Sequence, residues 1–298
     1  MTDSAAKSPT IIALADAPKE RRFLRVLQRA RRSPNIIVGT TILSVAIVLV
    51  VFAPVFTGFD PVEQFRRERL NPPGAVHVFG TDNLGRDIFS RVLYGGRISL
   101  QVGIISVAIA SVTGTFLGLI SGYFGRWADS LIMRLIDVLL AFPSILLALA
   151  IVAVLGRDLR NVMLAVGIAA LPVYTRVVRA STLSIKQTDY ITAAQAIGSS
   201  SWRILVAHIL PNVLAPIIVI STNGIASAII AGAALSFLGL GQQPPDPEWG
   251  LMLSQGREYI RVAWWVTAFP GLAIMITVLA INLLGDGLRD VLDPRLKM

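Results

Sequence analysis

The sequence contains no cysteine and only two histidines, His77 and His208. The absence of cysteine excludes disulfides, thiolate nucleophiles and cysteine metal sites, and two histidines so far apart exclude a histidine-rich zinc site. Charged residues are also scarce, at 15% of the chain, whereas a soluble domain carries about 25%. With 54% hydrophobic residues, the composition indicates an integral membrane protein whose fold is dictated by lipid.

The signatures of several enzyme classes are missing as well. The sequence has no phosphate-binding GxxxxGKS/T loop, no Gly-x-Ser-x-Gly elbow and no HExxH pair. We therefore predict that this chain is not an enzyme and does not bind ATP through a P-loop. The net charge of +9 suggests loops that face an anionic lipid leaflet rather than a nucleic-acid partner.

Long runs without charge predict the membrane topology. The first, Ile36–Phe56, is long enough to span a bilayer and too long for a signal-peptide core. Five more follow: Ile98–Gly125, Val138–Gly156, Asn161–Thr175, Val213–Pro245 and Val262–Gly285. Six spans place both termini on one side, and the excess of Lys and Arg there predicts that this side is the cytoplasm.

Four charged residues at span ends refine this topology. The second of the five later runs is expected to begin near Ser130, which carries Arg134 and Asp137 to the membrane edge, where they can pair locally. The third run is short, and we expect it to span if Arg176 and Arg179 extend to the inner interface.

Small and polar residues within the spans have structural interpretations. Gly114 and Gly118 match the small-xxx-small spacing that lets helices approach closely. Gln101, Asn223 and Asn282 can line a path or hold helices together, and the second role is the more frequent for lone polar side chains. No substrate-binding residue can be named from them.

The extramembrane segments have distinct characters. Residues 1–35 end in a basic cluster and predict either a short amphipathic surface helix or, for residues 1–18, a disordered tail. In the outer loop 57–97, Thr81 or Asp82 can cap a helix with Leu84, Ile88 and Val92 on one side and Arg86, Asp87 and Arg91 on the other. That pattern predicts an amphipathic helix along the outer interface, acting as a lid or contacting substrate.

A second outer segment lies between the last two spans. Pro244, Pro245 and Pro247 forbid a helix there and favour a rigid extended turn. Trp249, Trp264 and Trp265 suit the headgroup layer.

The stretch Tyr190–Pro211 is the polar island around which the chain is organised. Its first part carries the small residues Ala193, Ala194 and Ala196, and Gly198 is expected to end that helix. Ser199, Ser200 or Ser201 can cap a second helix with Ile204, Leu205, His208 and Ile209 at helical spacing, before Pro211 turns the chain back. A helix, a glycine elbow and a second helix at the membrane surface form a shape that a partner protein can grip.

These residues resemble the cytoplasmic loop signature of ABC-importer permeases, through Thr192-Ala193-Ala194, Gly198, His208, Leu210 and Pro211. Two positions depart from it, because Thr192 replaces a glutamate and His208 an apolar residue. Residues 80–91, 242–250 and 285–295 also resemble permeases of the dipeptide/oligopeptide/nickel import family, and in particular their C-type dipeptide permeases.

The resemblance implies the type I ABC importer permease fold, with residues 1–35 as a cytoplasmic segment and 36–298 as the permease domain. Within a coupling loop 182–211, it implies the following ATPase-coupling residues: Thr192, Ala193, Ala194, Gln195, Gly198, Ser199, Ser200, Ser201, Trp202, His208, Leu210 and Pro211.

It further implies a second homologous permease, two ATP-binding cassette subunits and an external substrate-binding protein, all meeting in the inner membrane of a bacterial cell. ATP and Mg²⁺ would be held by the cassette subunits, with no cofactor in this chain. The expected solute is a di- or oligopeptide or a related solute such as glutathione, haem or nickel. An ion-coupled secondary transporter is the alternative, although its usual internal repeats and midplane charges are not evident. A membrane scaffold without transport is a third possibility.

Overall fold

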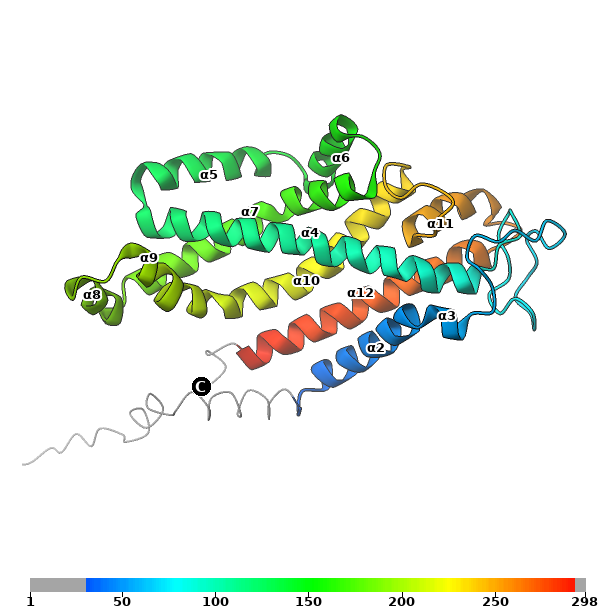
Figure 1. Cartoon of the computed structure of the whole chain (residues 1–298), viewed down its shortest axis with the longest axis horizontal. Helices are drawn as coiled ribbons and strands as arrows, with labels where there is room; N and C mark the ends of the chain where they lie inside the picture. The colour runs from blue at the N-terminus through cyan, green and yellow to red at the C-terminus, as the bar shows by residue number, and fades with distance from the viewer. Residues whose placement is uncertain (1–30, 293–298) are drawn as a thin grey trace, which may run out of the picture.

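The computed structural model describes residues 31–292, and their regular structure is helical throughout (Figure 1). The elements in chain order are α2 (Pro34–Val51), α3 (Ala53–Phe56), α4 (Ile88–Phe124), α5 (Arg126–Leu140), α6 (Ser144–Leu155), α7 (Leu159–Lys186), α8 (Asp189–Ala196), α9 (Ser201–Arg203), the π-helix η2 (Ile204–Ile209), α10 (Leu210–Phe237), α11 (Trp249–Gly256), the 3₁₀-helix η3 (Arg257–Tyr259) and α12 (Trp265–Leu292). The predicted all-α membrane fold is confirmed. The prediction for the basic N-terminal segment falls largely on residues 1–30, outside the described residues.

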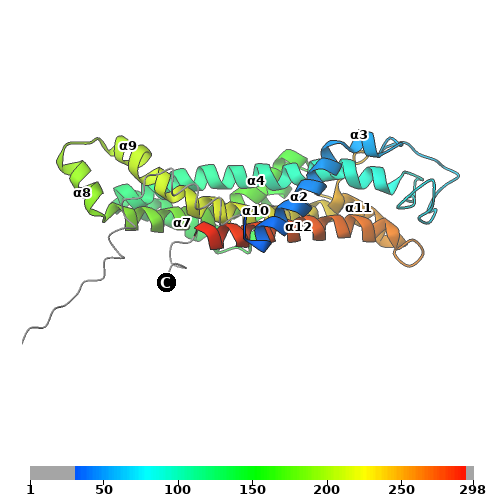
Figure 2. The ribbon, with the colours of Figure 1, turned by 90° about the horizontal axis from the view of Figure 1, so that it is seen from below.

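The long helices run side by side in an elongated bundle, with α8 and α9 at one end and loop 57–87 at the other (Figures 1 and 2). Within residues 31–292, five helices are long and apolar enough to cross a membrane, and a sixth crossing results if α5 and α6 count as one span. The beginning of α2 lies against the end of α12, since a Cβ added to Gly39 would come 2.7 Å from Leu284 N. Two described ends that lie together fit an even number of crossings, in agreement with the predicted six.

The span predicted at Val138–Gly156 is wrong as one continuous helix. The chain forms α5 and α6 instead, and the two helices meet at an angle of 93°. Pro143 is the residue at the break, where it precedes the first residue of α6. Proline has no N–H to donate and disfavours helical backbone in the residue before it, so a helix entering this point ends.

Ion pairs hold α5 to α7 in an arrangement that differs from the prediction. Asp137 pairs with Arg176 at 2.6 Å, not with Arg134, and Asp129 accepts two hydrogen bonds from Arg179 at 2.6 and 2.7 Å. The helix α7 also needs no arginine extension to reach across a bilayer, because it runs for 28 residues from Leu159 to Lys186. The predicted boundaries underestimated this helix by stopping at Thr175.

Other predicted helix boundaries were also wrong: two helices are longer than predicted and one is shorter. The helix α4 begins at Ile88, well before the predicted Ile98, and α12 continues to Leu292, beyond the predicted Gly285. By contrast, α10 ends at Phe237, well before the predicted Pro245. Charge-free runs therefore located the spans but not their ends.

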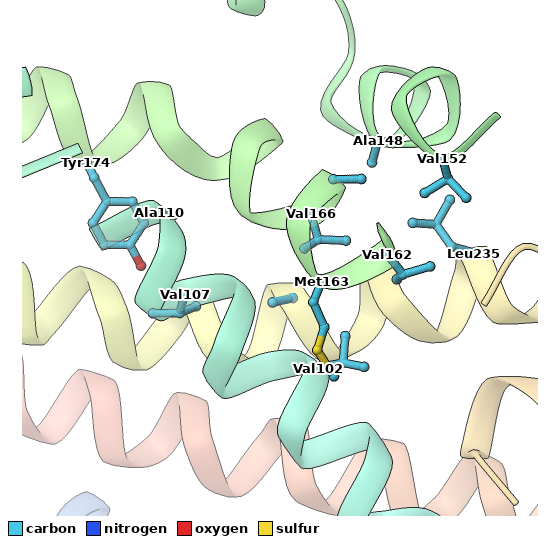
Figure 3. Packing of buried hydrophobic residues seen from close by; sticks show 12 residues of the cluster. Val102, Val107, Ala110, Ala148, Val152, Val162, Met163, Val166, Tyr174 and Leu235 are labelled. Carbon is cyan, nitrogen blue, oxygen red and sulfur yellow. The ribbon is translucent and has the colours of Figure 1, made fainter. Parts of the chain in front are cut away.

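Glycines bring α4 and α7 into close contact, as their spacing predicted. A Cβ added to Gly114 would lie 2.5 Å from Tyr174 Cβ, and one added to Gly118 would lie 2.7 Å from the Thr175 carbonyl oxygen. Figure 3 shows the core beside this contact, where Val107 and Tyr174 extend into the space between the helices. Of the lone polar residues, Asn223 packs against Gly285 between α10 and α12, whereas Gln101 and Asn282 are exposed.

The amphipathic helix predicted along the outer interface is wrong. Residues 81–87 form a compact turn in which Asp82 accepts hydrogen bonds from the Leu84 and Arg86 amides, and Asp87 is the cap of α4. The charged face expected in water is buried, with Arg86 2% and Arg91 1% exposed. Both guanidinium groups donate to Gln255 of α11, at 3.1 and 3.5 Å, so the turn is a packed part of the bundle.

The tryptophans were predicted for the headgroup layer, and two of the three do not lie at the surface. Trp249 and Trp265 are buried and donate through their indole N–H groups to the carbonyls of Val92 and Thr81. Trp264 is 56% exposed, so for this residue the headgroup layer stays a prediction. The proline-rich segment before Trp249 is non-helical, as its composition required.

Candidate coupling surface and cavity

The first half of the predicted coupling loop folds as a short helix closed by glycine. After α8, Gly198 adopts a φ of +82°, which a residue with a Cβ rarely adopts. The Gly198 amide donates to the Gln195 carbonyl, and the Ser199 amide donates to the Ala194 carbonyl, both at 3.0 Å. This pair of bonds is a Schellman motif, so the elbow has a defined conformation and is not a loose linker.

The second half begins as predicted but does not form a separate helix. Ser200 is the cap, and its hydroxyl accepts a hydrogen bond from the Arg203 amide at 3.4 Å. From Ser201 the backbone runs through α9, η2 and α10 as one helical unit ending at Phe237. The predicted turn at Pro211 is therefore wrong. Pro211 cannot donate to a carbonyl one turn earlier, and the wider π-helical turn at Ile204–Ile209 lies immediately before it.

One side of the elbow is fixed to the bundle by apolar contacts. Ile191 and Ala194 of α8 and Ile204, Leu205 and Ile209 of η2 are buried in a cluster with Tyr123 of α4 and Val178 of α7. Lys186 at the end of α7 donates to the Tyr123 carbonyl at 2.6 Å. The elbow is thus attached to the ends of two long helices, and a displacement of the elbow must displace them too.

The opposite side presents large apolar side chains to solvent. Ile197 is 83% exposed and Trp202 is 69% exposed, and they flank the Gly198 turn. Tyr190 and Val206 add smaller exposed areas. We call these four exposed residues together the elbow face, and α8 and α9, between which the elbow lies, are at one end of the bundle (Figure 2).

The predicted coupling residues divide between the two sides. Only Ala194 is buried, and Ser199, His208 and Leu210 are partly covered. The remaining eight are exposed: Thr192, Ala193, Gln195, Gly198, Ser200, Ser201, Trp202 and Pro211. Of the four residues of the elbow face, only Trp202 was predicted, and Ile197, Tyr190 and Val206 were not. A signal was present for the position of Ile197, because it lies directly before Gly198 and the glycine marks the end of α8.

A cavity of about 950 Å³ lies between α6, α7 and α10. Its lining is mostly Ala, Val and Ile side chains, with Asn212 and Ser227 of α10, Ser144 of α6 and Arg289 of α12 among the polar groups. Among the described residues that line it, Arg289 alone is charged. The α10 wall of this cavity belongs to the same continuous helical unit as α9, the part of the elbow that begins at Ser201.

Comparison with known proteins agrees with this architecture. The family described as "Binding-protein-dependent transport system inner membrane component" matches residues 114–298. The dipeptide transport system permease protein DppC of Alkalihalophilus pseudofirmus is 50% identical over 91% of this chain and 89% of its own. The glutathione transport system permease protein GsiD of Pectobacterium atrosepticum is 48% identical over 93% of this chain and 90% of its own.

A solved structure supplies the likeness in fold. An inward-facing conformation of the MetNI methionine ABC transporter superposes on 67% of this chain and 96% of its own, with a TM-score of 0.54 and 20% sequence identity. At that identity the likeness concerns the fold alone. It confirms the predicted type I ABC importer permease fold.

Proposed function

The chain belongs to the family of inner membrane components of binding-protein-dependent transport systems, and from this premise we propose that it carries small peptides across the membrane. It is an integral, multi-pass inner membrane protein and a permease subunit. Two relatives are named for dipeptide and glutathione transport, and glutathione is itself a small peptide. Peptides are therefore the solute class proposed here, delivered by an external substrate-binding protein.

The elbow face is the proposed contact with an ATP-binding subunit. One observation carries this proposal: Ile197 and Trp202, 83% and 69% exposed, flank a glycine turn that is fixed to the bundle on its other side. Large exposed apolar groups on an ordered surface are typical of protein interfaces. ATP and Mg²⁺ then act on the partner subunit, and this chain supplies no catalytic residue. This orientation places the elbow and both termini in the cytoplasm.

The continuous helix can transmit a movement of the ATP-binding subunit to the cavity through which the solute passes. A partner that moves Trp202 in α9 acts on the same helical unit that forms the α10 wall of the cavity. Helices are stiff along their axis, so displacement at one end is carried to the other. The cavity has a neutral, mostly small-chain lining apart from Arg289. Such a lining suits a passage that lets different peptides through better than it suits a selective binding site.

A second permease completes the cavity in this proposal. Ser144 and Ile145 of α6 line the cavity and are exposed, and Phe142 and Leu146 beside them are each 55% exposed. We propose that a second permease of the same fold packs against these exposed apolar residues and closes the cavity on this side. The permease domain proposed is thus one half of a passage, residues 36–298, with residues 1–35 as a cytoplasmic extension.

The experiment replaces Ile197 and Trp202 together by alanine and measures both ATPase binding and ATP-driven peptide uptake in proteoliposomes. Removing an interface anchor costs about 2 kcal/mol, or roughly 30-fold in affinity, for each residue. Val262→Ala is the matched control, because Val262 is also an exposed apolar residue, at 70%, but lies in the loop before α12. Unchanged ATPase binding in the double variant would refute the elbow contact. Uptake that needs only an ion gradient would refute the ATP-driven permease and support a secondary transporter.

A further inference from the structure

His77 lies between two carboxylates in loop 57–87, at the opposite end of the bundle from the elbow. Its side chain is 4% exposed. The Nδ1 atom lies 2.8 Å from Asp87 Oδ1, and the Nε2 atom lies 2.7 Å from Glu68 Oε2. Both ring nitrogens are therefore engaged, on opposite sides of the ring, by residues from the two flanks of the loop.

The surroundings of the ring leave these carboxylates as its electrostatic partners. Phe59 and Phe65 cover the imidazole, with ring centroids 4.7 and 5.9 Å away. Arg86, which precedes Asp87 in the chain, does not contact His77, because its guanidinium group pairs with Asp82 at 2.7 Å and donates to Gln255. Glu68 and Asp87 are thus the charged groups that the described structure places against His77.

The two contacts require the doubly protonated ring. An ionised carboxylate only accepts hydrogen bonds, and a neutral imidazole has a single N–H to donate. Burial by itself lowers the pKa of His77, but the hydrogen bonds and charges of Asp87 and Glu68 outweigh it and raise this pKa above its ordinary value of 6.5. The contact therefore loses one of its two hydrogen bonds when the proton leaves the ring.

The two carboxylates differ in what they can do after that loss. The Asp87 side chain is 3% exposed, and it also accepts the Ser90 amide at 2.7 Å as the cap of α4. The Glu68 side chain is 42% exposed. A buried carboxylate retains the remaining N–H, whereas one that is partly in water can be solvated there.

We propose that His77 is a pH-sensitive latch that holds the Glu68 side of loop 57–87 against the α4 N-terminus when protonated and releases it when deprotonated. Because the folded-state pKa is raised, the latch contributes fully below the unfolded value and is lost as the pH rises through the folded value. The release is local: the segment around Glu68 loosens, and the Asp87 cap of α4 stays in place. This inference stands apart from the proposed function, although that function puts the loop on the outer side of the inner membrane, where pH is less controlled than in the cytoplasm.

The test follows amide hydrogen exchange of residues 63–70 in the full-length protein in nanodiscs, corrected for the intrinsic pH dependence of exchange. The titration of His77 is followed by NMR in the same samples, where only two histidines contribute. We expect protection of residues 63–70 to fall as His77 loses its proton, by about tenfold for each unit by which the latch raises the pKa. The amides of α11 should not respond.

Glu68→Gln is the decisive variant, because Gln can donate to an unprotonated ring nitrogen. It should lower the pKa of His77 and keep residues 63–70 protected at alkaline pH. Glu63→Gln removes an exposed acid from the same loop and is the matched control, expected to behave as wild type. The latch is overturned by wild-type protection that does not follow the His77 titration, or by a Glu68→Gln variant with the wild-type response.

Discussion

Substitutions of Gly198 can distinguish the effect of backbone conformation at the elbow from the effect of side-chain size. Its φ of +82° lies in the left-handed region, and a Cβ added there would meet no atom within 4 Å. The penalty for a side chain at this position is therefore conformational and not steric within this chain. A left-handed backbone costs an L-residue about 1–2 kcal/mol, less for Asn and more for a β-branched residue. The expected order of disturbance is Asn, then Ala, then Val.

The chain can relieve this strain by opening the Schellman turn between α8 and α9. Opening the turn changes the direction in which Ile197 and Trp202 project, because these residues flank it on either side. A binding partner must then restore the native turn, at a cost equal to the relieved strain. An expense of about 1–2 kcal/mol weakens ATPase binding by roughly 5- to 30-fold.

The assay measures the dissociation constant between the ATPase subunit and the permease in nanodiscs for the Gly198→Asn, Gly198→Ala and Gly198→Val variants. Peptide uptake driven by ATP is measured in parallel. If contact with the partner's surface at this point were the cause, the loss would follow side-chain size and Asn would be far worse than Ala. That order, or wild-type binding by the Val variant, would refute the argument from backbone conformation.

Two further predictions concern stability. Gly118→Ala should lower the melting temperature, because the added Cβ would lie 2.7 Å from the Thr175 carbonyl oxygen. Gly271→Ala in α12 is the control and should raise the melting temperature slightly, because only Leu253 is near, at 3.9 Å. Equal shifts in thermal unfolding would contradict the close α4–α7 contact. Glu248→Ala should lower the free energy of unfolding by about 0.5–2 kcal/mol, because it removes the cap that accepts hydrogen bonds from the Gly250 and Leu251 amides. Glu248→Gln should lower it less, because the amide oxygen of Gln still accepts. If chemical denaturation found the Gln variant less stable than the Ala variant, the role of the cap would be refuted.

The elbow could be predicted from the sequence because its signals are local. Gly198 ends α8 through bonds to residues within five positions, and Ser200 caps the next helix through a bond to Arg203. No distant part of the chain decides either feature. The continuation through Pro211 was missed because a proline inside a helix usually ends or kinks it, and the sequence does not reveal the π-helical turn that lies before this one.

Loop 57–87 could not be predicted, because its partners are far away in the chain. Arg86 and Arg91 were assigned to a solvated face on the rule that arginine is exposed, yet both donate to Gln255, more than 160 residues later. Buried arginines are tolerated only where carboxylates and carbonyls surround them, as Asp82 does here. The amphipathic pattern was real, but its polar side packs against protein instead of water.

Thr192 stands where the permease loop signature has a glutamate, and this difference determines which contacts can supply the binding free energy of the proposed docking. Thr192 is exposed, and its hydroxyl lies 3.5 Å from the Thr188 carbonyl of its own helix, so it brings no charge to a partner. Asp189 and Arg203, the charged residues of α8 and α9, lie at the two ends of the elbow, where exposed ion pairs contribute about 0–1 kcal/mol. Burial of Ile197 and Trp202 is the larger source, because removing such side chains from water contributes about 1.5–3 kcal/mol each. The ATPase that fits this permease therefore needs an apolar recess for these two residues and no cationic partner for position 192.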